Sequence, residues 1–80
     1  MMSAYILVQL GDLSGWKDVD DLHHALHAIA GVKSVHLLAG PTDVILYVEA
    51  ADQMGLVNVV AGVRGVKGVK STDTRIVMPL

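Results

Sequence analysis

The sequence has 80 residues and a mass of 8.5 kDa, so we expect a single domain over residues 1–80. Apolar residues make up 52% and charged residues 18%, a composition that excludes intrinsic disorder. The formal net charge of −2 argues against direct binding to nucleic acid, and the absence of cysteine excludes disulfides and thiolate chemistry. With no membrane-spanning apolar run and no signal peptide, we expect a cytoplasmic protein with no membrane partner.

Four strands are expected where β-branched and aromatic residues gather between turn residues. They cover residues 4–10, 32–39, 44–49 and 70–78. The second and third are separated only by Gly40-Pro41-Thr42-Asp43, whose residue types suit a tight turn, so they are expected to form a hairpin.

Two helices are expected from apolar residues at helical spacing. The first follows Ser14 and ends at Gly31, and the second begins at the N-cap Asp52. The apolar stripe of the first helix and its following strand recurs 37 residues later, as Val19 and Leu56, Leu22 and Val59, Leu26 and Val63, Ile29 and Val66, Val32 and Val69. The order β-α-β-β-α-β with this duplication predicts a ferredoxin-like α+β fold, in which both helices cover one face of a four-stranded antiparallel sheet.

The predicted strands are apolar on both faces. A sheet covered by helices on one side only should alternate apolar and polar residues. Here Tyr5, Leu7, Ile45 and Tyr47 lie opposite the side chains expected in the core, and Met54 and Val57 lie opposite the core stripe of the second helix. Because apolar area of this extent marks an interface, we expect a homo-oligomer, either a dimer joined sheet to sheet or a larger ring. The alternative is a monomer with an apolar ligand groove.

Histidines are the first candidate site residues. His23 and His27 stand at i and i+4 on the first helix and can chelate a metal together, but two ligands make an incomplete site. A solvated helix flank is therefore favoured, and neither a metal nor a cofactor is expected. His36 lies in a strand with no recognisable nucleophile beside it, which favours a partly buried strand histidine over a general base.

The hairpin turn and the last strand supply the other candidates. The Asp43 carboxylate is a suitable partner for a ligand ammonium group, although an Asx turn explains it equally. Thr72 and Thr74 present two hydroxyls on one face of the last strand, although threonine is also common in strands for its β-propensity.

The sequence resembles the C-terminal regulatory, amino-acid-binding (RAM) domain of the Lrp/AsnC family of transcription regulators. The resemblance is carried by GVKSVHLLAGPTDVILYVEA around the hairpin and by LVNVVAGVRGVKGVKSTDTRIVM at the end of the chain. It implies a β-α-β-β-α-β domain that dimerises through its sheets, assembles further into octamers or related rings, and binds a free amino acid between dimers. By this resemblance, Gly40 and Asp43 hold the ligand amino group, Thr72 and Thr74 hold its carboxylate, and His36 and Ile76 line the pocket.

Regulators of this family carry a helix-turn-helix domain before the RAM domain, whereas this sequence begins at the first strand, as stand-alone versions do. The start Met1-Met2 favours a complete chain. We therefore expect an oligomeric effector-binding module in transcription regulation, without enzymatic activity, that can form mixed assemblies with full-length regulators. One alternative is a small dimeric α/β-barrel enzyme of the monooxygenase or isomerase type, with His36 catalytic in a pocket between sheet and helices. Another is an assembly domain without a ligand.

Overall fold

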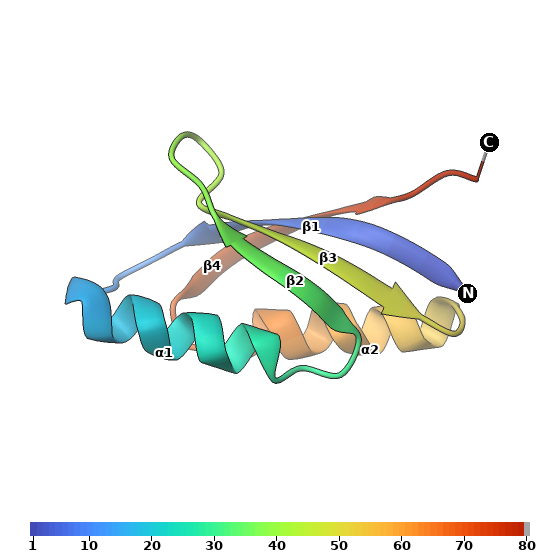
Figure 1. Ribbon diagram of the computed structural model, residues 1–80, viewed down its shortest axis with the longest axis horizontal. Helices are drawn as coiled ribbons and strands as arrows, with labels where there is room; N and C mark the ends of the chain where they lie inside the picture. The colour runs from blue at the N-terminus through green and yellow to red at the C-terminus, as the bar shows by residue number, and fades with distance from the viewer. Residues whose placement is uncertain (80) are drawn as a thin grey trace.

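The computed structural model describes residues 1–79 and shows a sheet with two helices packed beneath it (Figure 1). In chain order the elements are β1 (Met2–Leu10), α1 (Gly15–His27), β2 (Val32–Leu37), β3 (Val44–Ala50), α2 (Gln53–Arg64) and β4 (Val69–Ile76). The predicted order β-α-β-β-α-β is confirmed. Asp52 is confirmed as the N-cap of α2, since its carboxylate oxygen Oδ1 accepts a hydrogen bond of 2.8 Å from the backbone N–H of Gly55.

Element ends differ from the predictions by a few residues. Helix α1 ends at His27 rather than at Gly31, because residues 28–30 form a turn before the chain enters β2. Strand β2 ends at Leu37, since the next N–H, that of Leu38, is bonded to the carbonyl of Asp43 within the hairpin turn (2.8 Å). Helix α2 ends at Arg64, with Gly65 as its C-cap.

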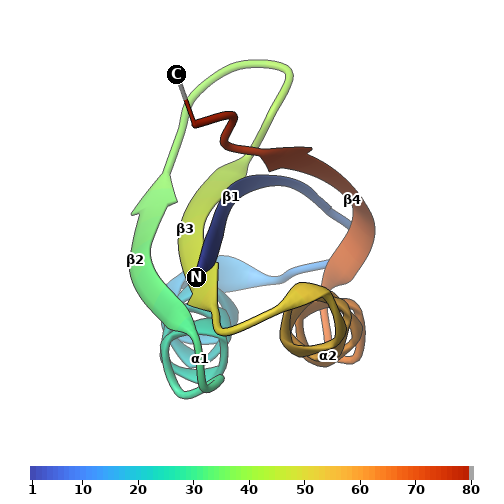
Figure 2. The same ribbon diagram turned by 90° about the vertical axis from the view of Figure 1, so that its right-hand side faces the viewer.

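The sheet has the strand order β2-β3-β1-β4, and all neighbouring strands are antiparallel. Figure 2 shows that the sheet curves over both helices, which lie side by side on the same face. This arrangement confirms the ferredoxin-like α+β fold. It leaves β2 and β4 as the two edges of the sheet and buries β1 and β3 between them.

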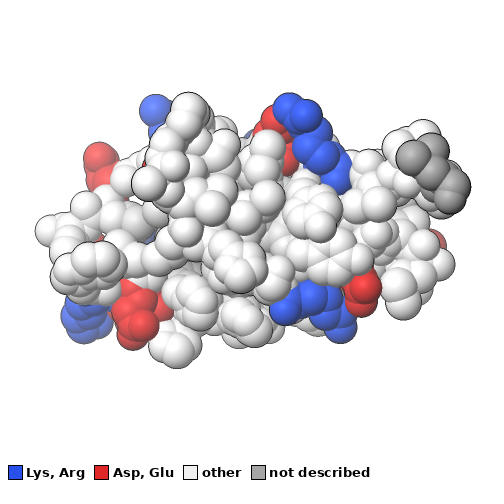
Figure 3. Space-filling view, turned by 45° about the horizontal axis from the view of Figure 1, so that its top comes forward, with Lys and Arg blue, Asp and Glu red and all other residues white. Residues whose placement is uncertain are grey.

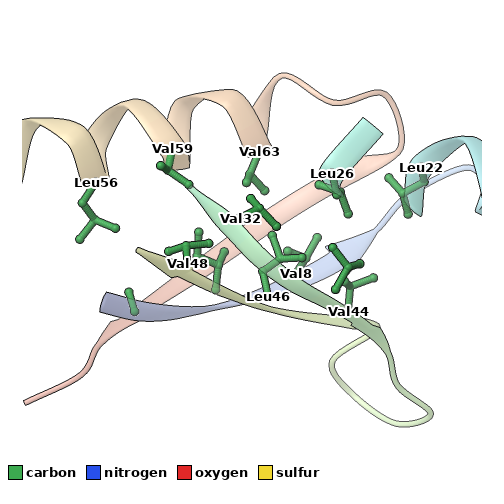
Figure 4. Packing of buried hydrophobic residues seen from close by; sticks show 13 residues of the cluster. Val8, Leu22, Leu26, Val32, Val44, Leu46, Val48, Leu56, Val59 and Val63 are labelled. Atoms are coloured by element: carbon green, nitrogen blue, oxygen red, sulfur yellow. The ribbon is translucent and has the colours of Figure 1, made fainter. Parts of the chain in front are cut away.

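The core lies between the sheet and the helices, where side chains from every layer meet (Figure 4). Alternate residues of the two central strands point into it and are completely buried, namely Ala4, Ile6, Val8, Val44, Leu46 and Val48. The helices cover them with the predicted stripes, of which Leu22, Leu26, Leu56, Val59 and Val63 are buried. No polar side chain is buried among the described residues, so the core is held by apolar packing alone.

The 37-residue duplication in the sequence is also a duplication of backbone geometry. Gly31 and Gly68 stand at equivalent places, each before the strand that follows a helix, with φ of 99° and 100°. The carbonyl of Gly31 accepts a hydrogen bond from Glu49 and that of Gly68 accepts one from Gly11, both 2.8 Å long. Each helix therefore returns to the sheet through the same glycine turn, which a residue with a side chain would strain.

The sheet face opposite the helices is apolar, as the sequence predicted. Tyr5 is 45% exposed, Leu7 and Ile45 are half-buried, and the ring of Tyr47 lies 5.2 Å from that of Tyr5. In the space-filling view most of this side is uncharged, and charged side chains lie at its margins (Figure 3). We call this side of the sheet, with Tyr5, Leu7, Ile45 and Tyr47 at its centre, the outer face; neither helix packs on it.

We predict that Gly31→Ala destabilises the protein by about 2–4 kcal/mol. A Cβ at Gly31 would lie 2.8 Å from both the Glu49 carbonyl oxygen and a methyl carbon of Val59, in addition to the unfavourable φ. Gly15→Ala is the matched control, because Gly15 also has a positive φ (77°) but no atom within 4 Å of its Cβ position. Thermal unfolding at one fixed protein concentration measures the difference. Equal losses in the two variants would show that the close contact at Gly31 is unimportant.

Candidate ligand-binding site

Asp43 joins the hairpin turn to the end of the central strand β1. Its backbone N–H donates to the carbonyl of Val8 (3.1 Å), and its carboxylate oxygen Oδ2 accepts a hydrogen bond from the N–H of Leu10 (2.9 Å). The pairing of β1 with β3 ends at Val8 and Val44, so the Leu10 N–H has no strand partner on that side and bonds to the Asp43 side chain instead. The second carboxylate oxygen, Oδ1, accepts no hydrogen bond from residues 1–79 and is available to a ligand.

A small hollow of about 240 Å³, which we call the hairpin hollow, lies between the hairpin turn and the start of β4. Gln9 bridges its two sides, because its amide nitrogen donates to the Pro41 carbonyl (3.1 Å) and its amide oxygen accepts from the Ser71 hydroxyl (3.3 Å). The hollow is lined by Leu7, Gln9, Thr42, Ser71, Thr72 and Asp73. Among the candidate residues from the sequence, Thr72 therefore lies close to the turn that contains Asp43. Gly40 lies in the exposed part of the same turn.

Thr74 and Ile76 lie farther along β4 and belong to a different hollow. Their partners in β1 are Ile6 and Ala4, so both point toward the helix side of the sheet, as Thr72 does opposite Val8. This confirms that Thr72 and Thr74 share one face. Because β4 is an edge strand, these side chains are not fully covered, and a mainly apolar groove of about 230 Å³ separates them from α2. It is lined by Gln53, Leu56, Val57, Val60, Thr74 and Ile76.

His36 lies at the opposite edge of the sheet from the threonines. It pairs with Ile45 in β3 and so stands on the outer face, away from the helices, where it is exposed. The expectations of a partly buried His36, and of a pocket for it between sheet and helices, are therefore wrong. Because β2 is a short strand at the edge of the sheet, no other element of the described chain covers His36. One chain does not bring His36 to Thr72 or Thr74.

Two opposite charges beside the hairpin hollow, those of Asp73 and Arg75, neutralise each other. Asp73 faces the outer side, opposite Leu7, and accepts hydrogen bonds from the Arg75 guanidinium, with Nη2 at 2.9 Å and Nε at 3.1 Å. This contact lowers the pKa of the Asp73 carboxyl and raises the pKa of Arg75. Both groups are thus kept ionised, and the pair leaves little net charge at the mouth of the hollow.

Sequence reasoning missed Gln9, Thr42, Ser71 and Asp73 as lining residues. Gln9 had a visible signal, because it is the polar exception in the apolar run AYILVQL of β1. Its contacts to Pro41 and Ser71 span 32 and 62 residues of sequence, and only the folded sheet reveals them. Within residues 1–79, no three His, Asp or Glu side chains converge on a metal position, and no helix is long and apolar enough to cross a membrane.

Several solved structures are similar to this chain over its whole length. TTHA0845 from Thermus thermophilus is 26% identical with a TM-score of 0.83, and the match covers 100% of this chain and 96% of that one. The feast or famine regulatory protein Rv3291c from M. tuberculosis, solved with L-methionine, is 25% identical with a TM-score of 0.80. A transcriptional regulator of known crystal structure is 25% identical to this chain, with a TM-score of 0.82. The chain spans only 52% of each of these two regulators.

The comparison with curated proteins returned no match. A family model described as the Lrp/AsnC ligand binding domain matches residues 3–79, which is nearly the whole chain. The match includes all six structural elements from β1 to β4 except the first residue of β1, together with the hairpin turn and its Asp43. The chain therefore belongs to the Lrp/AsnC ligand-binding domain family.

Proposed function

We propose that this chain is a non-enzymatic effector-binding and oligomerisation module that binds a free amino acid. The observation that carries the proposal is the second oxygen of Asp43, which no described residue bonds, in the same turn whose Thr42 lines a hollow with the Ser71 hydroxyl and with Thr72. A carboxylate with one free oxygen suits an ammonium group, and hydroxyls suit a carboxylate. The family match and the methionine complex of the M. tuberculosis regulator support an amino acid as the ligand.

The proposed site is completed by a second copy of the chain. Gly40, Asp43 and Thr72 lie at one end of the sheet, Thr74 and Ile76 lie in the groove beside α2, and His36 lies on the other edge. The hollow at the turn is open on the outer side, where a neighbouring chain can supply the missing wall. In the proposed assembly, two outer faces pack together in a dimer, and dimers join into a ring that brings these separated residues together.

Mixed assembly with full-length regulators of the same family is part of this proposal. Such regulators would meet this chain through the same apolar outer face by which it pairs with itself. The alternative role of His36 as a catalytic base gains no support, because His36 stands exposed at an edge and no described side chain bonds to it. The proposed module therefore acts by binding and assembly, on a regulator that supplies the contact with DNA.

We predict that one or a few amino acids stabilise the protein in a thermal-shift screen of all twenty at millimolar concentration. A ligand at about one hundred times its dissociation constant adds roughly 2.7 kcal/mol, which raises the melting temperature of a chain this small by several degrees. Asp43→Asn should abolish the response while preserving the fold, because its amide oxygen can still accept from Leu10 N–H. Asp43→Ala removes that acceptor and is expected to lower stability as well, so it is the weaker test.

Thr72→Val tests the other end of the ligand with little change in shape, and should weaken the same response. Lys33→Gln is the control, since Lys33 is exposed on β2 and contacts neither hollow. An unchanged response in Asp43→Asn would remove Asp43 from the site. If no amino acid stabilises the wild-type protein, amino-acid binding is excluded, and the assembly domain without a ligand becomes the better description.

We predict that Ile45→Lys breaks the assembly, because it places a charge in the middle of the apolar outer face. Val57→Lys is the matched control, since Val57 is also a β-branched apolar residue open to solvent (52% exposed) but lies on α2, away from that face. Sedimentation equilibrium at micromolar concentration should give a multiple of 8.5 kDa for the wild type and 8.5 kDa for Ile45→Lys, with Val57→Lys at least dimeric. A wild-type mass of one chain would contradict the proposed oligomer.

A further inference from the structure

The second half of helix α1 carries three histidines, at positions 23, 24 and 27. The rings of His23 and His27 lie one turn apart, with centroids separated by 5.7 Å and planes inclined by 35°. His24 is directed toward Asp20, with its Nε2 atom 3.5 Å from the carboxylate oxygen. Among residues 1–79, His23 and His27 make no hydrogen bond or ion pair, so their ring nitrogens are free. We propose that His23 and His27 chelate one divalent transition-metal ion.

The spacing of the two rings is close to that of a chelate. Two histidines at i and i+4 of a helix are the pair that binds zinc in helical metal motifs, because their Cβ atoms lie on the same face. With metal–nitrogen bonds of about 2.0–2.1 Å, two imidazoles on one ion have ring centroids about 4.5–5 Å apart. The rings of His23 and His27 need to approach by only about 1 Å, which small side-chain rotations can supply.

The surroundings of the pair favour a cation. His27 is the last residue of α1, and the free carbonyl groups of the final turn carry the negative end of the helix dipole. The exposed carboxylate of Asp20 lies one turn before His23. His23 is half-buried and lines a hollow with Trp16, Val19 and Leu37, which restricts its ring and lowers the entropy lost on binding.

The donor set determines which ions fit. Imidazole nitrogen suits Zn²⁺, Cu²⁺ and Ni²⁺, whereas Mg²⁺ and Ca²⁺ prefer oxygen ligands. No third protein ligand converges on this position within residues 1–79, so water fills the remaining coordination positions. Without the glutamate of helical metalloprotease motifs, the pair binds a metal and performs no hydrolysis. The sheet separates α1 from the outer side on which the hairpin hollow opens, so metal and effector occupy independent sites.

Calorimetric titration of the untagged protein with NiCl₂, and separately with ZnCl₂, tests the proposal. We expect one ion per chain, and an affinity that falls about tenfold or more in both His23→Gln and His27→Gln, because a chelate is reduced to a single imidazole. His24→Gln and His36→Gln are matched controls with the same chemical change and should bind as the wild type does. Glutamine is a good helix former, so α1 is retained, and far-ultraviolet circular dichroism of each variant verifies this.

Two results would overturn the proposal. One is a wild-type protein that takes up neither ion at millimolar concentration. The other is an equal loss of affinity in His24→Gln and His27→Gln. That result would show that the metal binds non-specifically to the histidine-rich surface rather than to the His23–His27 pair. The N-terminal amine is present in all variants, so any metal that it binds cancels in the comparison. Thermal stabilisation by NiCl₂ in the wild type but not in His27→Gln provides an independent readout.

Discussion

Burial of one face of β1 and β3 beneath two helices is the interaction on which the rest of the structure depends. Ile6, Val8, Val44 and Leu46 are completely enclosed in this layer, and no buried polar group assists them among the described residues. Each completely buried aliphatic side chain contributes about 1.5–3 kcal/mol relative to an exposed one. Because two helices cover only one side of a four-stranded sheet, the same arrangement leaves the equally apolar outer face without a cover. The proposed dimer follows from this imbalance.

Asp43 connects the fold to the proposed site. One of its carboxylate oxygens accepts a hydrogen bond from the Leu10 N–H at the irregular end of β1, and the other is unbonded among residues 1–79, in the turn whose Thr42 lines the hollow. A group fixed in this way loses little entropy when it binds a ligand, which suits a binding role. The same contact makes Asp43 structurally necessary, so replacing it with alanine confuses loss of binding with loss of stability. Asparagine separates the two effects because it retains an acceptor.

The three surfaces of the molecule differ in chemistry and are assigned different roles. The outer face is apolar and lacks charge at its centre, which suits a second copy of the chain. The hairpin hollow combines hydroxyl, amide and carboxylate groups, which suits a small zwitterion. Helix α1 presents unpaired imidazoles beside carboxylates, which suits a transition-metal ion. The proposed metal site shares no residue with the other two surfaces and can fail without affecting them, whereas the proposed effector site depends on the second copy of the chain.

Local pattern determined much of this protein from the sequence alone. The helical stripes, the Asp52 cap, the duplication and the turn at Gly40–Asp43 predicted the element order and the core correctly, because each depends on periodicity or on neighbouring residues. The apolar residues on both sides of β1 and β3 also predicted the uncovered outer face. Tertiary structure alone decided which edge and which face each candidate residue occupies. His36 is placed on the outer face at one edge and Thr74 on the helix side at the other, because strand order and register depend on contacts between distant segments. Gln9 shows the same limit, since its contacts to Pro41 and Ser71 form only after three separate segments meet at one end of the sheet.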